Sequence, residues 1–339
     1  MNSYSRNILQ SNENDKENNN DMKVIDIINS SQRPFASFEL VPPLKGSDVS
    51  RLYDSIEPLM QFQPPFINVT CHRDEVEYVP NADGTFKQMT VAKRPSTTAI
   101  VGAIIRRYPD LEVVPHVICG GASQSRVESE LLDLHFLGIQ NVVALRGDAL
   151  PGQRYFIPEA DGFSHSSELV TMIRNLNRGQ YLDPTVKKGL STDFCIGVAG
   201  YPEKHFEAAN LDTDIQHLKE KVEAGADYIV TQMFFDNQKF YAFVDRLRQA
   251  GITIPVVPGL KPISSQRQID LLPRSFHIDI PQELVSEMAK AKTPEATYQV
   301  GIEWAIQQSR DLLAHGVPAI HYYTMARPDN VCKIVKAVF

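Results

Sequence analysis

The chain has 339 residues, of which 42% are hydrophobic and 22% are charged, a composition typical of a globular protein with a sizeable core. The formal net charge of −7 disfavours a broad surface for nucleic acid or an acidic membrane, so small-molecule partners are favoured. No apolar run predicts a membrane-spanning helix and no secretory signal pattern is present, so we expect a cytoplasmic protein. The cysteines are scattered, which argues against a disulfide framework and a zinc site.

Residues 1–21 are rich in Asn, Ser, Glu and Asp and contain few apolar residues. Such a segment cannot bury enough apolar surface to offset the conformational entropy lost on ordering, so we expect a disordered polar tail. From residue 22 to residue 339, short β-branched apolar runs alternate with amphipathic segments of helical period. This alternation predicts one domain over residues 22–339.

Eight strands are predicted, at residues 36–41, 66–71, 112–119, 141–146, 194–200, 228–235, 255–260 and 319–324. Each is followed by a predicted helix, and these helices span residues 47–60, 97–108, 123–137, 166–177, 212–224, 237–250, 265–272 and 328–337. Two further helical patterns, at 281–291 and 293–314, precede the eighth strand. The sequence therefore predicts an α/β fold, a (β/α)8 TIM barrel with a helical insertion before the eighth strand.

The common nucleotide-binding signatures are missing from the sequence. No Gly-x-Gly-x-x-Gly follows a predicted strand, and no Gly-x-x-x-x-Gly-Lys-Ser/Thr occurs. A Rossmann dinucleotide fold and a P-loop are therefore unsupported, and any nucleotide cofactor must be held in another way.

Glu39 is a carboxylate within the apolar run of the first predicted strand. A carboxyl group held among buried residues either has a hydrogen-bonded partner or has its pKa raised by desolvation. Pro42 and Pro43 stop the strand, so Glu39 lies near its C-terminal end, which is the catalytic end of a parallel barrel. Glu39 is therefore either a general acid or a structural glutamate that pairs with a neighbouring basic group.

Polar residues also occur at or after the C-terminal ends of other predicted strands. They are Thr70, His116, Arg146, Gly147, Asp148, Tyr201, Gln232 and Arg327. A lone histidine such as His116 is more often a core residue with satisfied hydrogen bonds than a ligand. Because seven strand ends carry polar candidates when Glu39 is counted, we interpret them as one shared pocket at the catalytic face.

The predicted helix at 212–224 carries Asp214, His217 and Lys221 at positions i, i+3 and i+7, which share one helix face. The neighbouring Glu220 is expected to point elsewhere. One interpretation is a solvated face with a weak ion pair. The other is that this face, together with His205 and Arg146, binds an anionic cofactor group such as a pyrophosphate.

Five segments carry a family resemblance. They are Ser37-Phe38-Glu39 with Pro42-Pro43, Leu145-Arg146-Gly147-Asp148, Tyr201-Pro202-Glu203-Lys204-His205, the run Leu-Lys-Glu-Lys-Val-Glu-Ala-Gly-Ala-Asp at 218–227, and Thr231-Gln232-Met233-Phe234-Phe235-Asp236. In this order, within residues 36–328, the chain resembles the methylenetetrahydrofolate reductase family. It resembles the short members of that family, which consist of the catalytic domain only.

The resemblance implies an FAD-dependent oxidoreductase that reduces 5,10-methylenetetrahydrofolate to 5-methyltetrahydrofolate with NAD(P)H and so supplies methyl groups for methionine synthesis. In this family the two substrates take turns on one flavin face in a ping-pong scheme. A barrel without a Rossmann motif is compatible with that chemistry, because FAD stays bound and the nicotinamide only visits.

Residue roles follow by matched position. Glu39 resembles the general acid that protonates the folate N10, and Asp148 resembles the aspartate beside the flavin and the pterin. Gln232 matches a residue that hydrogen-bonds the pterin, and Arg327 matches an arginine near the benzoyl-glutamate end of the folate. The positions that match FAD contacts are Thr70, His116, Arg146, Gly147, Asp148, Ser166, Tyr201, His205, Asp214, His217 and Lys221.

The sequence departs from some bacterial members of the family at three places. Cys71-His72-Arg73 replaces Tyr-Gly-Ala, Gln266 replaces a phenylalanine that packs on both substrates, and His217 with Glu220 replace Asn and Arg. No ribose-reading motif distinguishes NADH from NADPH. The sequence also does not decide between a monomer and a homo-oligomer.

Two other function classes are compatible with the barrel. One is a Schiff-base aldolase that uses Lys261, which follows the seventh predicted strand. The other is a barrel that binds folate or flavin without turnover. The presence of both carboxylates, Glu39 and Asp148, counts against the binding protein, and a lysine in the position of Lys261 is usually a solvated loop residue.

Overall fold

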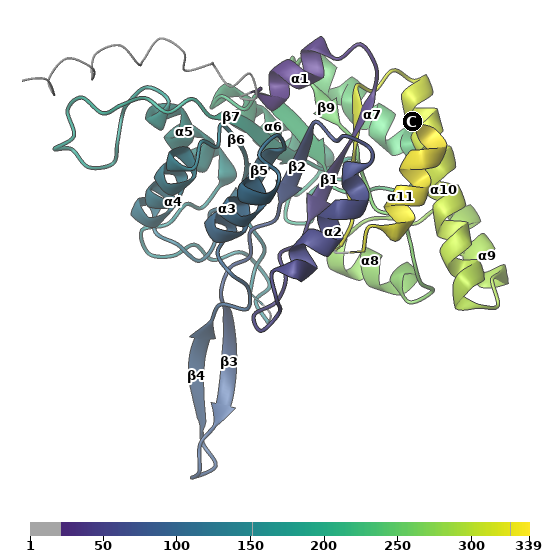
Figure 1. Ribbon diagram of the computed structural model, residues 1–339, viewed down its shortest axis with the longest axis horizontal. Coiled ribbons are helices and arrows are strands. Elements are labelled where there is room, and N and C mark those ends of the chain that lie inside the picture. Colours follow the sequence, from purple (N-terminus) through teal and green to yellow (C-terminus); the bar gives the residue numbers. More distant parts are fainter. Residues whose placement is uncertain (1–21, 151, 326) are drawn as a thin grey trace, which may run out of the picture.

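The computed structural model describes residues 22–150, 152–325 and 327–339. The disordered tail predicted for residues 1–21 lies outside the described residues. Within the described ranges, strands and helices alternate around a mostly parallel, nearly closed sheet (Figure 1).

The barrel strands are β1 (Phe35–Leu40), β2 (Phe66–Val69), β5 (Glu112–Ile118), β6 (Asn141–Leu145), β7 (Cys195–Gly200), β8 (Tyr228–Thr231), β9 (Val256–Val257), β10 (Gly259–Leu260) and β11 (Ala319–Tyr323). They are parallel, in the order β10-β11-β1-β2-β5-β6-β7-β8-β9. The predicted seventh strand is split into β9 and β10 at Pro258, which has no N–H to donate. Because β9 pairs with β8 and β10 pairs with β11, this one strand closes the barrel. The (β/α)8 prediction is confirmed.

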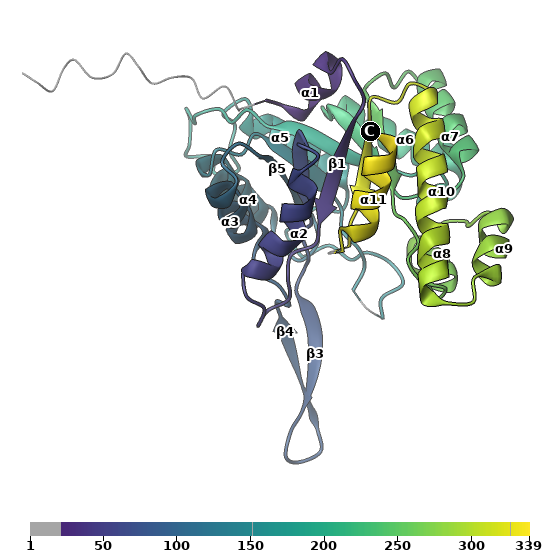
Figure 2. The same ribbon diagram turned by 45° about the vertical axis from the view of Figure 1, so that its right-hand side comes forward.

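The helices α2 (Ser50–Met60), α3 (Thr97–Arg107), α4 (Gln124–Phe136), α5 (Ser166–Leu176), α6 (Leu211–Glu223), α7 (Asn237–Gln249), α8 (Gln268–Phe276) and α11 (Asp329–Val338) follow the barrel strands. The predicted insertion is also confirmed, because α9 (Gln282–Lys290) and α10 (Pro294–Ala314) precede β11 and lie side by side at the flank of the barrel (Figure 2). Side-chain caps begin several of these helices; the Ser96 hydroxyl accepts from the N–H of Ala99, and Thr293 accepts from Ala296.

A helix that the sequence did not predict, α1 (Val24–Ser30), covers the N-terminal end of the barrel. Its buried side chains Val24, Ile27 and Ile28 join a cluster with residues that begin the barrel strands, such as Phe66 and Tyr228. The seven residues of α1 form only about two turns, so the segment is too short for a helical period of apolar residues to be recognised in the sequence.

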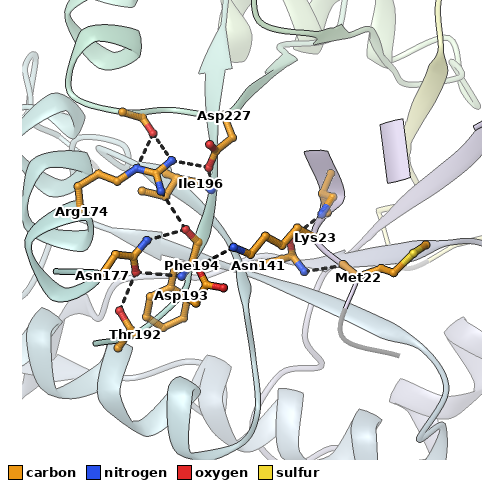
Figure 3. Close-up of polar contacts among 12 residues, drawn as sticks. Met22, Lys23, Asn141, Arg174, Asn177, Thr192, Asp193, Phe194, Ile196 and Asp227 are labelled. Carbon is orange, nitrogen blue, oxygen red and sulfur yellow. Dashed lines mark hydrogen bonds and ion pairs between the residues drawn. The ribbon is translucent and has the colours of Figure 1, made fainter. Parts of the chain in front are cut away.

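Polar side chains form hydrogen bonds and ion pairs that stabilise the N-terminal end of the barrel (Figure 3). Asn141, at the start of β6, accepts a hydrogen bond from the N–H of Val24 and donates to the carbonyl of Met22. In the same region, the guanidinium of Arg174 from α5 binds the carbonyl of Gly225 and forms an ion pair with Asp227, both of which precede β8. The N-terminal end is therefore packed, and a ligand site has to lie at the opposite end.

A two-stranded ribbon, also not predicted, consists of β3 (Glu75–Pro80) and β4 (Phe86–Val91). It leaves the barrel after β2 and projects from the end opposite α1 (Figures 1 and 2). Its side chains are largely exposed on both faces, including Tyr78 and Phe86. The alternation of buried and exposed residues that predicts a half-buried strand is therefore absent from this segment.

Candidate active site

A cavity of about 700 Å³ opens at the C-terminal end of the barrel. Its volume lies within the range typical of small-molecule sites. The predicted site residues that line it are Glu39, Thr70, His116, Arg146, Gly147, Asp148, Ser166, Tyr201, His205, Asp214, His217, Lys221 and Gln232. The expected shared pocket is therefore present.

Arg327 is the predicted site residue that does not line this cavity. It is exposed after β11, and its backbone N–H donates to the carbonyl of Thr324 at 3.0 Å. Gln266 is likewise exposed and lies before α8, outside the cavity wall. Both residues lie on connections that follow barrel strands.

Glu39 lies at the base of the cavity between two histidines. Its Oε2 atom is 3.5 Å from His116 Nε2 and 4.0 Å from His321 Nε2, and only 12% of the glutamate side chain is exposed. Burial lowers the pKa of His116 to about 4, so this imidazole is neutral at neutral pH. Within the described ranges, the basic groups beside Glu39 are these two histidines, and no lysine or arginine pairs with it.

His321 comes from β11, next to β1 in the sheet, and its ring is almost completely buried. Its Nδ1 lies 2.8 Å from the hydroxyl of Ser37, which faces it across the two strands. Its Nε2 has no hydrogen-bond partner and is directed toward Glu39. The Ser37 hydroxyl therefore fixes the imidazole ring that borders the carboxyl group.

Asp148 follows β6 and approaches the cavity from another side. The chain turns at Gly147, whose φ of +85° favours glycine, and this turn brings the exposed Asp148 side chain to the wall. The preceding Arg146 is held by an ion pair with Glu207, and its guanidinium carbon lies 4.9 Å from the centre of the Phe156 ring. The wall after β6 thus carries the Asp148 carboxylate, which forms no ion pair among the described residues, and the Arg146 guanidinium, whose charge is balanced by Glu207.

The predicted shared face of α6 is confirmed. Asp214, His217 and Lys221 all line the cavity, but so does Glu220, so the expectation that Glu220 points elsewhere is wrong. Asn210 caps the helix by accepting from the N–H of Thr213 at 2.8 Å. From this start, α6 runs along the cavity wall, and its lining residues extend from Asp214 in the first turn to Lys221 in the last.

Lys221 and Asp214 on this face are both largely buried. The Lys221 ammonium donates to the carbonyl of Ala199 at 2.7 Å, and Asp214 accepts from the N–H of His205 at 3.0 Å. Burial lowers the pKa of Lys221 to about 8 and raises the pKa of Asp214. Burial also lowers the pKa of His205 to about 4. A buried ammonium group bound to a single carbonyl in a cavity wall is suited to an anionic ligand group.

Gln232 ends the wall on the side of β8. Its backbone N–H donates to the carbonyl of Gly200, and its side-chain oxygen accepts from the N–H of Met233 at 2.9 Å. The amide nitrogen is thereby turned away from its own backbone. Nearby, the Tyr323 hydroxyl donates to the carbonyl of Thr231, which joins β11 to β8 across the cavity.

Several residues around the cavity were not among the predicted site residues, although His72 was noted as part of a departure from the family. Asn68, His72, Tyr323 and Met325 line it, and His321 borders Glu39 from below. His321 and Tyr323 lie two residues apart on β11, so both side chains point to the barrel interior. The period of two along a strand could have identified this pair.

Lys261, the residue on which an aldolase would depend, does not line the cavity. It is only 6% exposed, which contradicts the expectation of a solvated loop residue, and lies beside a narrow crevice with Phe235, Leu284 and Trp304. Burial lowers its pKa to about 8. This crevice has no room for a water-sized ligand, so a carbonyl substrate could not reach the lysine.

The cavity lining includes groups that could hold the anionic part of a cofactor such as FAD. Lys221 and Arg146 supply cationic groups that suit a pyrophosphate, Asp214 and Asp148 lie close to them, and Gln232 also lines the cavity. In the described ranges no cluster of three or more His, Cys, Asp or Glu residues could hold a metal ion. Among the helices of those ranges, none combines the length and the apolarity needed to cross a membrane.

Known proteins similar to this chain support a family assignment. Residues 23–338 match the family model described as methylenetetrahydrofolate reductase. The chain is 33% identical over 304 residues to methylenetetrahydrofolate reductase 1 of Schizosaccharomyces pombe, and the match covers 89% of this chain and 45% of that protein. It is 34% identical over 318 residues to methylenetetrahydrofolate reductase (NADH) 1 of Arabidopsis thaliana, with 90% of this chain and 48% of the relative covered.

The chain thus spans about half the length of these relatives. It is also 31% identical over 294 residues to 5,10-methylenetetrahydrofolate reductase of Escherichia coli, and that match covers 86% of each chain. A solved structure described as an uncharacterized protein from Clostridium thermocellum that binds two copies of 5-methyl-5,6,7,8-tetrahydrofolic acid has a TM-score of 0.53 and 12% identity. That match covers 92% of this chain and 96% of the other and concerns the fold. On the family match and the identities to its curated relatives, the chain belongs to the methylenetetrahydrofolate reductase family.

Proposed function

We propose that this protein reduces 5,10-methylenetetrahydrofolate to 5-methyltetrahydrofolate in the cytoplasm, with NAD(P)H as electron donor and bound FAD as carrier, in a ping-pong reaction. The product would supply methyl groups for methionine synthesis. One observation carries the proposal: the cavity holds Glu39 between two histidines at its base and Asp148 on a separate wall. We further infer that residues 22–339 act as one catalytic barrel.

Glu39 is the proton donor in this proposal. Opening the five-membered ring of the folate requires a proton on N10, and a carboxyl group in a largely enclosed site can carry that proton if it is protonated when the substrate binds. The groups nearest its carboxyl oxygen are the neutral His116 ring and the ring of His321.

Asp148 provides a negative charge beside the reacting groups. A carboxylate in this position favours cationic character on the folate and disfavours negative charge on a neighbouring cofactor. The side chain is exposed to the cavity and forms no ion pair among the described residues. Its charge is therefore free to act on a ligand.

The remaining polar residues bind and orient the ligands. FAD, when bound, supplies a group that accepts hydride from the nicotinamide and donates it to the folate. Lys221, Arg146 and His205 would hold its anionic part, and Gln232 would bind the pterin through its free amide nitrogen. We place Arg327, which is exposed after β11, beside the glutamate end of the folate.

The test is anaerobic stopped-flow spectroscopy of the flavin in the wild type and in Glu39→Gln. We expect that wild-type flavin is reduced by NADH or NADPH and reoxidised by methylenetetrahydrofolate. In Glu39→Gln, reduction should persist, whereas reoxidation by the folate should slow by about 10² or more, because the amide cannot donate the proton. Reoxidation at the wild-type rate would contradict the role of Glu39, and a protein that binds no flavin would contradict the proposed function.

A further inference from the structure

His72 lies on the cavity wall and is linked to a second residue of that wall. It is exposed, follows Thr70 by two residues and lies 2.9 Å from the Thr70 hydroxyl through Nε2. The segment between β2 and the β3–β4 ribbon carries both side chains. At the base of the ribbon, Lys93 after β4 forms an ion pair with Glu77 of β3, and the Arg94 guanidinium donates to the carbonyl of Pro42. The loop that carries His72 therefore connects β2 to a ribbon whose base is attached to the segment after β1.

Charged groups from several elements face the His72 ring. Glu39 of β1, Asp148 after β6 and Glu75 of the ribbon favour its protonated form, whereas Arg94 opposes it. His116 of β5 also lies within electrostatic reach of the ring. Although the residue is exposed at the surface, partial desolvation of its ring by the cavity wall, together with Arg94, lowers the pKa of His72, so the ring is neutral at neutral pH. Both carboxylates of the proposed reaction therefore interact with this one imidazole.

The Thr70 hydroxyl has a single proton, and its direction depends on His72. A neutral imidazole with its proton on Nδ1 accepts the Thr70 proton, so the hydroxyl offers only lone pairs to the cavity. With the proton on Nε2 the imidazole donates, and the Thr70 hydroxyl can then donate to a ligand. The pair can reverse its hydrogen bond without movement of any heavy atom.

We propose that His72 is a positioning residue of this site, which sets whether the Thr70 hydroxyl donates to or accepts from the bound ligand. The inference rests on the proposed function, in which the same cavity receives two substrates in turn. These ligands present donors and acceptors in different arrangements, and a reversible hydroxyl serves both. The residue acts through Thr70 rather than on a reacting atom.

The test is a double-mutant cycle with His72→Phe, Thr70→Val and the double variant. Two quantities are measured: the dissociation constant of FAD, by titration of the apoprotein, and the rates of the two flavin half-reactions. We expect each single variant to lose roughly fivefold to tenfold in at least one quantity, and the double variant to lose no more than either single one. His72→Gln, whose amide can donate or accept, should recover most of the loss.

A structural role of His72 would not produce this coupling. Additive effects of the two substitutions, or wild-type values in His72→Phe, would overturn the inference. The pH profile of the folate half-reaction gives a second readout, because the wild type should show an ionisation below the ordinary histidine value of about 6.5 that His72→Gln lacks. Identical profiles would also overturn it.

The two proposals fail in distinguishable ways. If the wild type binds FAD but methylenetetrahydrofolate does not reoxidise the flavin, the proposed function is contradicted. The role of His72 is then decided by the FAD dissociation constants of the variants alone. If the wild type reacts as proposed and the cycle shows no coupling, only the inference about His72 falls. A wild-type protein without FAD binding overturns both.

Discussion

Neighbouring groups, rather than depth of burial alone, distinguish the two carboxylates of the cavity. Glu39 is enclosed by two imidazoles, of which His116 is neutral because burial lowers its pKa to about 4. Asp148 is exposed to the cavity and stands on a glycine turn. A proton donor needs an environment that tolerates its neutral form, whereas an electrostatic residue must stay ionised. The roles proposed for Glu39 and Asp148 therefore place opposite requirements on their surroundings.

Asp148→Asn tests the electrostatic role. Removal of the negative charge should raise the flavin reduction potential, because reduced flavin then develops its charge without repulsion. It should also slow the folate half-reaction on the order of tenfold or more, since the charge no longer favours a cationic folate. The potential is measured by dye-coupled titration and the rate by stopped flow. An unchanged potential would contradict the role of Asp148.

Lys221 couples cofactor binding to pH. Burial lowers its pKa to about 8, so its ammonium charge is lost as the pH rises through that value in the empty protein. We expect FAD affinity to fall above about pH 8 and Lys221→Met to lose about tenfold or more at pH 7, because a charge-assisted contact disappears. Fluorescence titration of the apoprotein measures both. Lys221→Arg, which keeps the charge, is the control, and a pH-independent affinity would refute this assignment.

The lowered pKa of Lys221 also makes the stability of the empty protein depend on pH, but in the direction opposite to that of FAD affinity. Below about pH 8 the folded and unfolded states both carry the Lys221 proton, so burial of the ammonium costs stability. Between about 8 and the ordinary value of 10.5, the unfolded state binds more protons, and this contribution to stability rises with pH. The buried ammonium group of Lys221 therefore lowers the stability of the empty protein but supplies the charge that binds an anionic ligand.

Strand-end residues of the site could be predicted from the sequence, but partners brought from distant strands could not. Glu39 stands out because a carboxylate interrupts an apolar run, and Asp148 because it follows a strand. The histidine beside Glu39, His321, is 282 positions away by number and reaches it only because β11 pairs with β1. The role of His72 could be inferred only from its hydrogen bond to Thr70, which no local sequence pattern indicates.

Among the elements, the barrel was predictable, whereas α1 and the β3–β4 ribbon were not. Each barrel strand is a buried run bounded by turn residues, and its helix repeats apolar positions on one face. The helix α1 depends on a tertiary cap, because the Asn141 side chain binds the N–H of Val24 across the sequence. The ribbon is exposed on both faces, so its strands lack the apolar period.

Asn141→Ala tests the attachment of α1. The Asn141 side chain binds Val24 and Met22 and also donates to Glu112 at 2.7 Å, and its loss removes the acceptor of the buried Val24 N–H. We expect the free energy of unfolding to fall by about 2 to 3 kcal/mol in denaturant titration. Lys23→Met removes the neighbouring ion pair with the exposed Asp193 and should cost at most about 1 kcal/mol. Equal effects of both variants would show that the cap does not hold α1.

At the scale of the whole molecule, the two ends of the barrel differ in structure: one is closed and the other holds the cavity. Buried apolar residues and the Asn141 and Arg174 contacts close the N-terminal end, whereas the C-terminal end leaves polar groups around an open cavity. Pro258 divides the seventh strand, yet its carbonyl accepts from the N–H of His321 and keeps the closure intact.

Because residues from most barrel strands line one cavity, a bound cofactor should stabilise the whole barrel rather than one loop. FAD at one hundred times its dissociation constant should raise the free energy of unfolding by about 2.7 kcal/mol, since it binds only the folded state. Denaturant titration at increasing FAD concentration measures the effect. Lys221→Met should need proportionally more FAD for the same gain, because only its affinity is reduced. A free energy of unfolding that does not depend on FAD would mean that the cavity does not bind the cofactor.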